Sequence, residues 1–194
     1  MKSILDIKEK LIRTIGEKRF IHSIGVMETA VDLAKKYGVD EDKARMAGLL
    51  HDCAKYRDHL YLLKRVSDFD IILDDMMLQN KELIHGPLGA KVAEIEFGIK
   101  DKEILSSIYY HTIGKEDMSL LEKIIYIADF IEPGRTFQGV DFHREYAFKH
   151  LDGALRLSMD NTIKHLVDKG RLIHLNTIKA RNYLISIEKS ELDA

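Results

Sequence analysis

Apolar residues recur along this chain at the spacing of amphipathic helices. Ile24, Met27, Val31 and Ala34 lie three or four residues apart, and Gly38 follows them as a helix stop. No stretch of useful length alternates apolar and polar residues as a half-buried strand would. The pattern therefore predicts an all-α protein.

Start and stop signals divide this pattern into helices. Asp40 is expected to cap a helix from Glu41 to about Tyr56, and Asp101 to open the helix that carries His111. The His-Gly-Pro sequence at 85–87 predicts a helix entrance, because proline suits the first helical position and disfavours helix in the residue before it.

The second half of the chain carries similar signals. Ser119 and Glu122 form the signature of a capping box ahead of a helix over 121–131, which the Glu-Pro-Gly-Arg sequence at 132–135 is expected to end. From about 142 to 189 we expect two or three more helices, joined through 170–176.

The chain is long enough to bury one core, and nothing in it indicates a linker. It has 194 residues with no internal repeat, no low-complexity tract and only two prolines. We therefore predict a single compact helical domain over 1–194, with a core at about 18–135 and a C-terminal helical part at about 142–189.

Charge and composition exclude several classes of partner. The formal net charge is −2, without the basic excess of a nucleic-acid-binding domain. The N-terminus lacks an apolar signal core, and no apolar run reaches the length of a membrane span. Cys53 is the only cysteine, so no internal disulfide can form. We expect a cytoplasmic protein without nucleic-acid or membrane partners, and a homodimer is compatible with the sequence.

Three stretches place ionisable groups where a helix should be apolar. They are 47–54, 108–111 and 124–131, and the last holds Asp129 within an almost continuous apolar run. A buried carboxylate costs several kcal/mol unless it is paired or coordinates a metal. A cation is therefore expected to meet Asp129.

Histidine and aspartate residues elsewhere in the chain could complete a shell around that cation. Imidazole nitrogen and carboxylate oxygen suit Zn, Fe, Mn and similar divalent ions, and ligands scattered over several helices are typical of metal sites in bundle cores. The predicted shell consists of His22, His51, Asp52, His85, His111 and Asp129.

These residues also follow the order of a known motif. His22, the His51-Asp52 pair and Asp129 match the motif that names the HD-domain phosphohydrolase superfamily. The segments 19–22, 48–52, 85–87, 110–112 and 127–135 together resemble the bacterial YqeK family, over about 18–183. That family usually carries His-Pro-x-Thr before Ala-Arg-Asn. Here 174–177 reads His-Leu-Asn-Thr, so that Leu175 replaces the proline, and Ala-Arg-Asn follows at 180–182.

The resemblance implies a hydrolase that cleaves diadenosine tetraphosphate (Ap4A) symmetrically to two ADP. It implies that His22, His51, Asp52 and Asp129 bind a metal ion. Iron is the ion expected from the resemblance, and Mn and Zn are the alternatives. It implies His85 and His111 as ligands of a second ion or as phosphate contacts, with Asp52 as the bridge. Asp52, His85 and His111 are then the expected catalytic residues, around a hydroxide that the metal generates near neutral pH.

Basic side chains near the motif are candidates to bind the phosphate chain. Lys55 follows His51 by one helical turn, and 171–177 precedes a helix N-terminus, which favours an anion. The expected nucleotide contacts are Arg19, His22, Lys55, His85, His111, Arg135, Arg171, His174, Thr177 and Arg181.

Two alternatives stay open. The same chemistry could act on another nucleotide, or the chain could be a non-catalytic nucleotide-sensing module with a structural metal. The histidines outside the motif, His59, His143, His150 and His165, are expected to be solvated or at an interface, and Cys53 to be a small buried hydrophobe.

Overall fold

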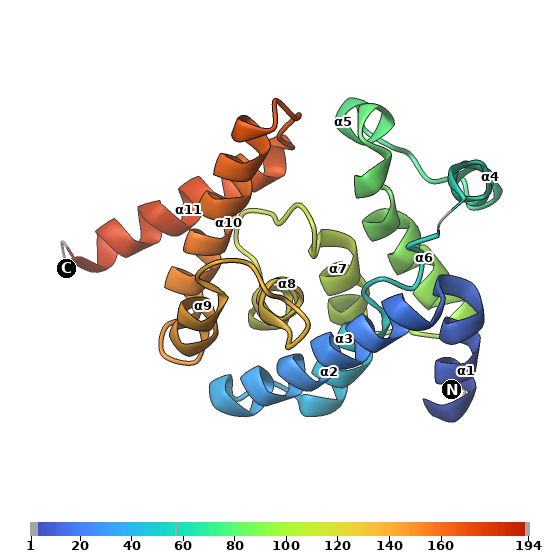
Figure 1. The fold of residues 1–194 in the computed structure, drawn as a ribbon, viewed down its shortest axis with the longest axis horizontal. Coiled ribbons are helices and arrows are strands. Elements are labelled where there is room, and N and C mark those ends of the chain that lie inside the picture. Colours follow the sequence, from blue (N-terminus) through green and yellow to red (C-terminus); the bar gives the residue numbers. More distant parts are fainter. Residues whose placement is uncertain (1–3, 57, 193–194) are drawn as a thin grey trace.

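The computed structural model describes residues 4–56 and 58–192, with side chains for 6–56 and 58–189. Within these ranges it holds eleven α-helices, one short 3₁₀ helix and no strand, which confirms the all-α prediction (Figure 1). The elements are α1 (Ile4–Ile15), α2 (Glu17–Tyr37), α3 (Glu41–Leu50), α4 (His59–Asp68), α5 (Asp75–Gln79), η1 (Lys81–Leu83), α6 (His85–Phe97), α7 (Lys102–Tyr110), α8 (Leu120–Ile131), α9 (Val140–Ala147), α10 (Leu151–Asp168) and α11 (Leu175–Leu192).

Helix α8 is the centre of the packing. It contacts α2, α3 and α7 on one side and α9 and α10 on the other, while α6 packs on α7 and α11 on α10 (Figure 1). Its residues Leu121, Ile124, Ile125 and Ile127 are at most 1% exposed. A helix that is apolar nearly all round has to be buried, so the sequence of α8 dictates its central place.

The capping signals are confirmed. The side chain of Asp40 accepts hydrogen bonds from the backbone N–H groups of Asp42 and Lys43. Asp101 caps α7 in the same way, and both arms of the capping box of Ser119 and Glu122 are present. Each cap satisfies backbone donors that the first helical turn leaves unpaired.

Three helix boundaries differ from the prediction. The helix expected to reach Tyr56 ends at Leu50, and His111 follows α7 instead of lying within it. In both places the histidine ring faces the carbonyl oxygen three residues earlier, at 2.7 Å for His51 Nδ1 and Gly48. That oxygen would accept the next helical hydrogen bond, so the side chain competes with continuation of the helix. Pro87 is the third residue of α6, not the first.

Two glycines allow the helices around α8 to approach closely. A Cβ atom on Gly48 would lie 2.8 Å from the Cα of Met27 in α2, and one on Gly86 would lie 2.6 Å from the carbonyl oxygen of Tyr109 in α7. Only glycine leaves room for these contacts. The second of them brings the start of α6 against the end of α7.

None of the helices in the described part of the chain combines the length and apolarity that crossing a membrane requires.

Candidate metal centre

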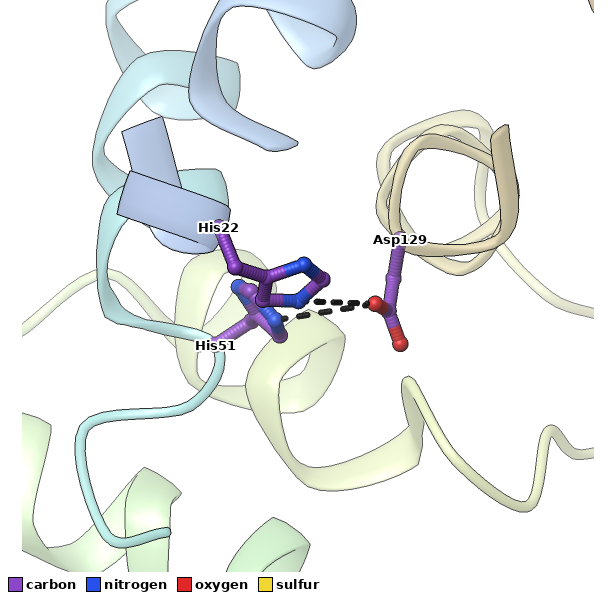
Figure 2. A group of neighbouring side chains, drawn as sticks. All are labelled: His22, His51 and Asp129. Atoms are coloured by element: carbon purple, nitrogen blue, oxygen red, sulfur yellow. Dashed lines mark ion pairs between the residues drawn. The ribbon is translucent and has the colours of Figure 1, made fainter. Parts of the chain in front are cut away.

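The six predicted ligands converge on one point from five elements. His22 comes from α2 and Asp129 from α8, and Figure 2 shows both side chains pointing toward the ring of His51. His51 and Asp52 directly follow α3, His85 begins α6 and His111 directly follows α7. Two overlapping triads have ligand atoms within 4.8 Å of one another, namely His22, His51 and Asp129, and His51, Asp52 and His111.

All four histidines turn Nδ1 outward to an oxygen acceptor. In His51 and His111 it lies 2.7 Å from the carbonyl oxygens of Gly48 and Ile108, three residues earlier in each case. His85 repeats this pattern, and Nδ1 of His22 lies 3.1 Å from a carboxylate oxygen of Glu132. A carbonyl or carboxylate oxygen needs a donor, so Nδ1 carries the hydrogen in each ring. The Nε2 lone pairs therefore point into the cluster.

These lone pairs have no donor to meet. Nε2 of His85 lies 3.0 Å from Nε2 of His111, and Nε2 of His22 lies 3.0 Å from Oδ1 of Asp129. In the described chain, Nε2 of His22 and of His51 is buried without a hydrogen bond. Lone pairs and carboxylates at such distances repel one another unless a proton or a metal ion lies between them. The donor set therefore fits a divalent metal ion.

The two oxygens of Asp52 face different histidines. Oδ2 lies 3.4 Å from Nε2 of His51, whereas Oδ1 lies 3.1 Å from Nε2 of His85 and 3.7 Å from Nε2 of His111. The carboxylate of Asp52 thus lies between His51 on one side and His85 and His111 on the other. An ion held on either side of Asp52 would therefore have one of its oxygens within reach.

The pKa shifts show that the two buried aspartates attract positive charge. Burial alone would raise the pKa of Asp52, but positive charge and hydrogen bonding from the facing histidine rings outweigh it and hold this pKa well below its usual value. A hydrogen bond from His22 and the charges of His51 and Arg135 lower the pKa of Asp129 in the same way, and the aspartates in turn raise the pKa of His51. A bound metal ion would take the place of the protons on these rings. Burial lowers the pKa of His85 to about 4, so this ring is neutral at pH 7 and keeps its Nε2 lone pair.

Three cationic side chains surround the cluster. Arg19 Nη1 lies 2.9 Å from Oδ2 of Asp52, and Arg135 Nη2 lies 2.6 Å from Oδ1 of Asp129. Nζ of Lys55 lies 3.1 Å from Nδ1 of His85. Lys55 lies in the loop after α3, and not in the helical turn predicted for it, because α3 ends at Leu50. All three line a cavity of about 880 Å³ into which His22 also opens.

The tail residues predicted to contact the nucleotide lie elsewhere. His174 pairs with Asp74 at 2.7 Å, Thr177 donates to the carbonyl of Ile113 at 2.9 Å and Arg181 pairs with Asp160 at 2.8 Å. None of them lines a cavity that borders the cluster, and neither does the exposed Arg171. Their contact with a nucleotide stays a prediction.

The local role of this tail is to begin a helix. Nδ1 of His174 accepts the backbone N–H of Asn176 at 3.1 Å, and Leu175 is the first residue of α11. Proline is favoured at this first helical position but is not required there. With leucine in its place, the backbone N–H of Asn176 still bonds the ring of His174, and the helix begins at the same residue.

Glu132 is a site residue that the sequence did not reveal. Its carboxylate is 5% exposed, faces Nδ1 of His22 through Oε1 and accepts the backbone N–H of Gly134 through Oε2 at 2.6 Å. The signal available was a charged residue directly after an apolar helix, which is typical of a surface turn. His143, predicted to be solvated or at an interface, is buried and accepts a hydrogen bond from Asn161 at 2.8 Å.

Comparisons with known proteins agree with this geometry. The HD domain family model matches residues 19–134. The chain is 43% identical to a symmetrical bis(5'-nucleosyl)-tetraphosphatase of Halalkalibacterium halodurans, over 90% of this chain and 93% of that protein. It is 41% identical to the Bacillus subtilis protein of the same name, over 89% and 92%.

A solved structure extends the likeness to the fold. The crystal structure of a protein from Clostridium acetobutylicum, described as a predicted HD superfamily hydrolase involved in NAD metabolism, superposes with a TM-score of 0.92 at 50% identity. The match covers 96% of this chain and 98% of that one.

Proposed function

The chain belongs to the HD domain family, and from that premise we propose that it hydrolyses Ap4A symmetrically to two ADP. Relatives named for symmetrical tetraphosphatase activity match 89 to 91% of the chain at 40 to 43% identity. The observation that carries the proposal is the His/Asp cluster beside the cationic groups of Arg19, Lys55 and Arg135. Such a site combines metal ligands with binding groups for a phosphate chain.

We propose that His22, His51, Asp52 and Asp129 hold one divalent ion. Their atoms form the inward-facing set of lone pairs and carboxylate oxygens described above. His85 and His111, with Oδ1 of Asp52, are proposed to hold a second ion or to contact phosphate. Iron is the ion we propose; the same nitrogen and oxygen donors also suit Mn and Zn.

When bound, such an ion stabilises charge on the phosphoryl oxygens and lowers the pKa of coordinated water toward about 7. The chain's own residues bind and orient the substrate. Arg19 and Arg135 each use part of a guanidinium on a carboxylate, so their remaining N–H donors can bind phosphate oxygens. Lys55 adds a positive charge. His85 is neutral at pH 7, and we propose that it acts with Asp52 and His111 as a ligand, not as a general acid.

The open cavity supports an enzyme over a sensor. A structural metal site is normally closed by its protein ligands, whereas His22 of this cluster borders a cavity of about 880 Å³, within the range of ligand pockets. Another nucleotide is the second candidate substrate, because the similar C. acetobutylicum protein is described with NAD metabolism. We also propose that the enzyme acts in the cytoplasm, because its substrate is a nucleotide.

The test is a product analysis of Ap4A hydrolysis by the metal-loaded protein. We expect ADP as the sole product, and loss of activity with helical content intact in Asp129→Asn. Asp68→Asn is the matched control, because Asp68 lies on the surface and pairs with Lys64. AMP plus ATP would refute symmetrical cleavage. Hydrolysis of NAD but not of Ap4A would favour the second candidate.

A further inference from the structure

A second cavity borders the cluster on the side of Asp129 and His111. Its volume is about 260 Å³, and it shares Arg135 with the larger cavity that His22 borders. The remaining lining residues are Thr112, Tyr126, Phe130, Phe137 and Thr162. The two cavities therefore border different residues of the cluster, with the guanidinium of Arg135 common to both.

Phe137 offers this cavity a supported aromatic ring. Its ring centroid lies 4.8 Å from that of Phe130, and Phe130 in turn packs edge-on against His143 at 5.1 Å. The side chain of Phe137 is nevertheless 37% exposed. An aromatic ring held from behind and open in front is the platform on which nucleobases stack.

We propose that the smaller cavity holds one nucleoside of the substrate, with its base stacked on Phe137. The inference rests on the proposed function, because a symmetrical dinucleotide cleaved at its centre extends a nucleoside on each side of the metal. The other nucleoside occupies the larger cavity, and Arg135 contacts the phosphate chain between them. The two cavities differ in size and lining, so two identical nucleosides are bound by different contacts.

The test compares two substrates with the same phosphate chain. Ap4A carries two nucleosides and adenosine 5'-tetraphosphate carries one, which we expect to bind in the larger cavity. We expect Phe137→Ala to raise the KM for Ap4A about tenfold, the loss of one base stack, and to leave the KM for adenosine tetraphosphate unchanged. Phe137→Tyr keeps the ring and should behave as wild type.

Phe142→Ala is the matched control for loss of an exposed ring. Phe142 is 59% exposed on α9 and stacks on Tyr146, outside both cavities. It should leave both KM values unchanged.

The proposal is overturned if Phe137→Ala changes the KM for Ap4A no more than Phe142→Ala does, or changes both substrates equally. If wild type does not cleave Ap4A at all, the proposed function fails, and titration of the metal-loaded protein with ADP then decides about the cavity. Two ADP bound per wild-type chain and one per Phe137→Ala chain would uphold it, whereas equal stoichiometry would refute it.

Discussion

Glu132 provides the sharpest test of how this cluster is held together. It is the carboxylate that faces Nδ1 of His22, and it fixes the ring with Nε2 toward Asp129. Outer carboxylates of this kind orient ligating histidines, and their loss typically weakens metal binding about 10- to 100-fold. We therefore expect Glu132→Gln to weaken metal binding by about 1.4 to 2.7 kcal/mol.

The same variant should fold. Glutamine keeps the volume of the side chain, and its one amide oxygen can still accept from either Nδ1 of His22 or the N–H of Gly134. Its NH₂ group then faces the other donor, so one of the two hydrogen bonds is lost. The expected cost in stability is about 1 kcal/mol.

The assay is competition for the metal with a chelator of known affinity, with Glu122→Gln as the matched control. Glu122 lies in the first turn of α8, at the opposite end of the helix from Glu132. It is 2% exposed, completes the capping box and pairs with Lys115. Its replacement should lower the melting temperature and leave metal affinity unchanged. The reasoning is refuted if Glu132→Gln binds metal as tightly as wild type, or if both variants lose affinity equally.

Three further predictions follow from the fold and the cluster. Gly86→Ala places a Cβ atom 2.6 Å from the carbonyl oxygen of Tyr109. It should lower the free energy of unfolding in urea by about 1 to 3 kcal/mol, and it should reduce activity because it displaces His85. An unchanged free energy of unfolding and unchanged activity would contradict this. Metal at 100 times its Kd should stabilise the fold by about 2.7 kcal/mol, so removal of the metal by a chelator should lower the melting temperature. An unchanged melting temperature would refute a bound ion. Burial alone would raise the pKa of Asp74, but hydrogen bonds from the backbone amide of Met77 and from the ring of His174 outweigh it and lower this pKa. The charge of Asp74 therefore stabilises the fold at pH values above the unfolded pKa of about 4. This stabilisation is lost as the pH falls through the folded pKa. The stability difference between wild type and Asp74→Asn, which keeps the cap, should therefore vanish in acid, and a constant difference would contradict the assignment.

The parts of the fold that the sequence predicted are those with local causes. Asp40, Asp101 and Ser119 cap helices because their side chains bond backbone groups two or three residues away, which is visible in the sequence. Asp129 stood out because a carboxylate in an apolar helix needs a cation. The early end of α3 was missed because His51 bonds Gly48, and helical periodicity does not show a ring that turns back on its own helix.

The parts that were missed depend on contacts between distant segments. Glu132 and His22 are 110 residues apart, and only the packing of α2 against α8 brings them together. Phe137 carries no local signal, because a cavity is a property of several elements at once. A resemblance supplied the order of the ligands, whereas the structure supplies the direction of each lone pair.

In the mechanism proposed here, the cluster holds a metal and directs water to the central anhydride of Ap4A. The most direct measurement is hydrolysis of Ap4A by the metal-loaded protein in water enriched in oxygen-18, with the products resolved by mass spectrometry. The account predicts ADP alone, with the label on the β-phosphate of one ADP in every pair. AMP and ATP as products, or no turnover by protein shown to contain metal, would contradict it.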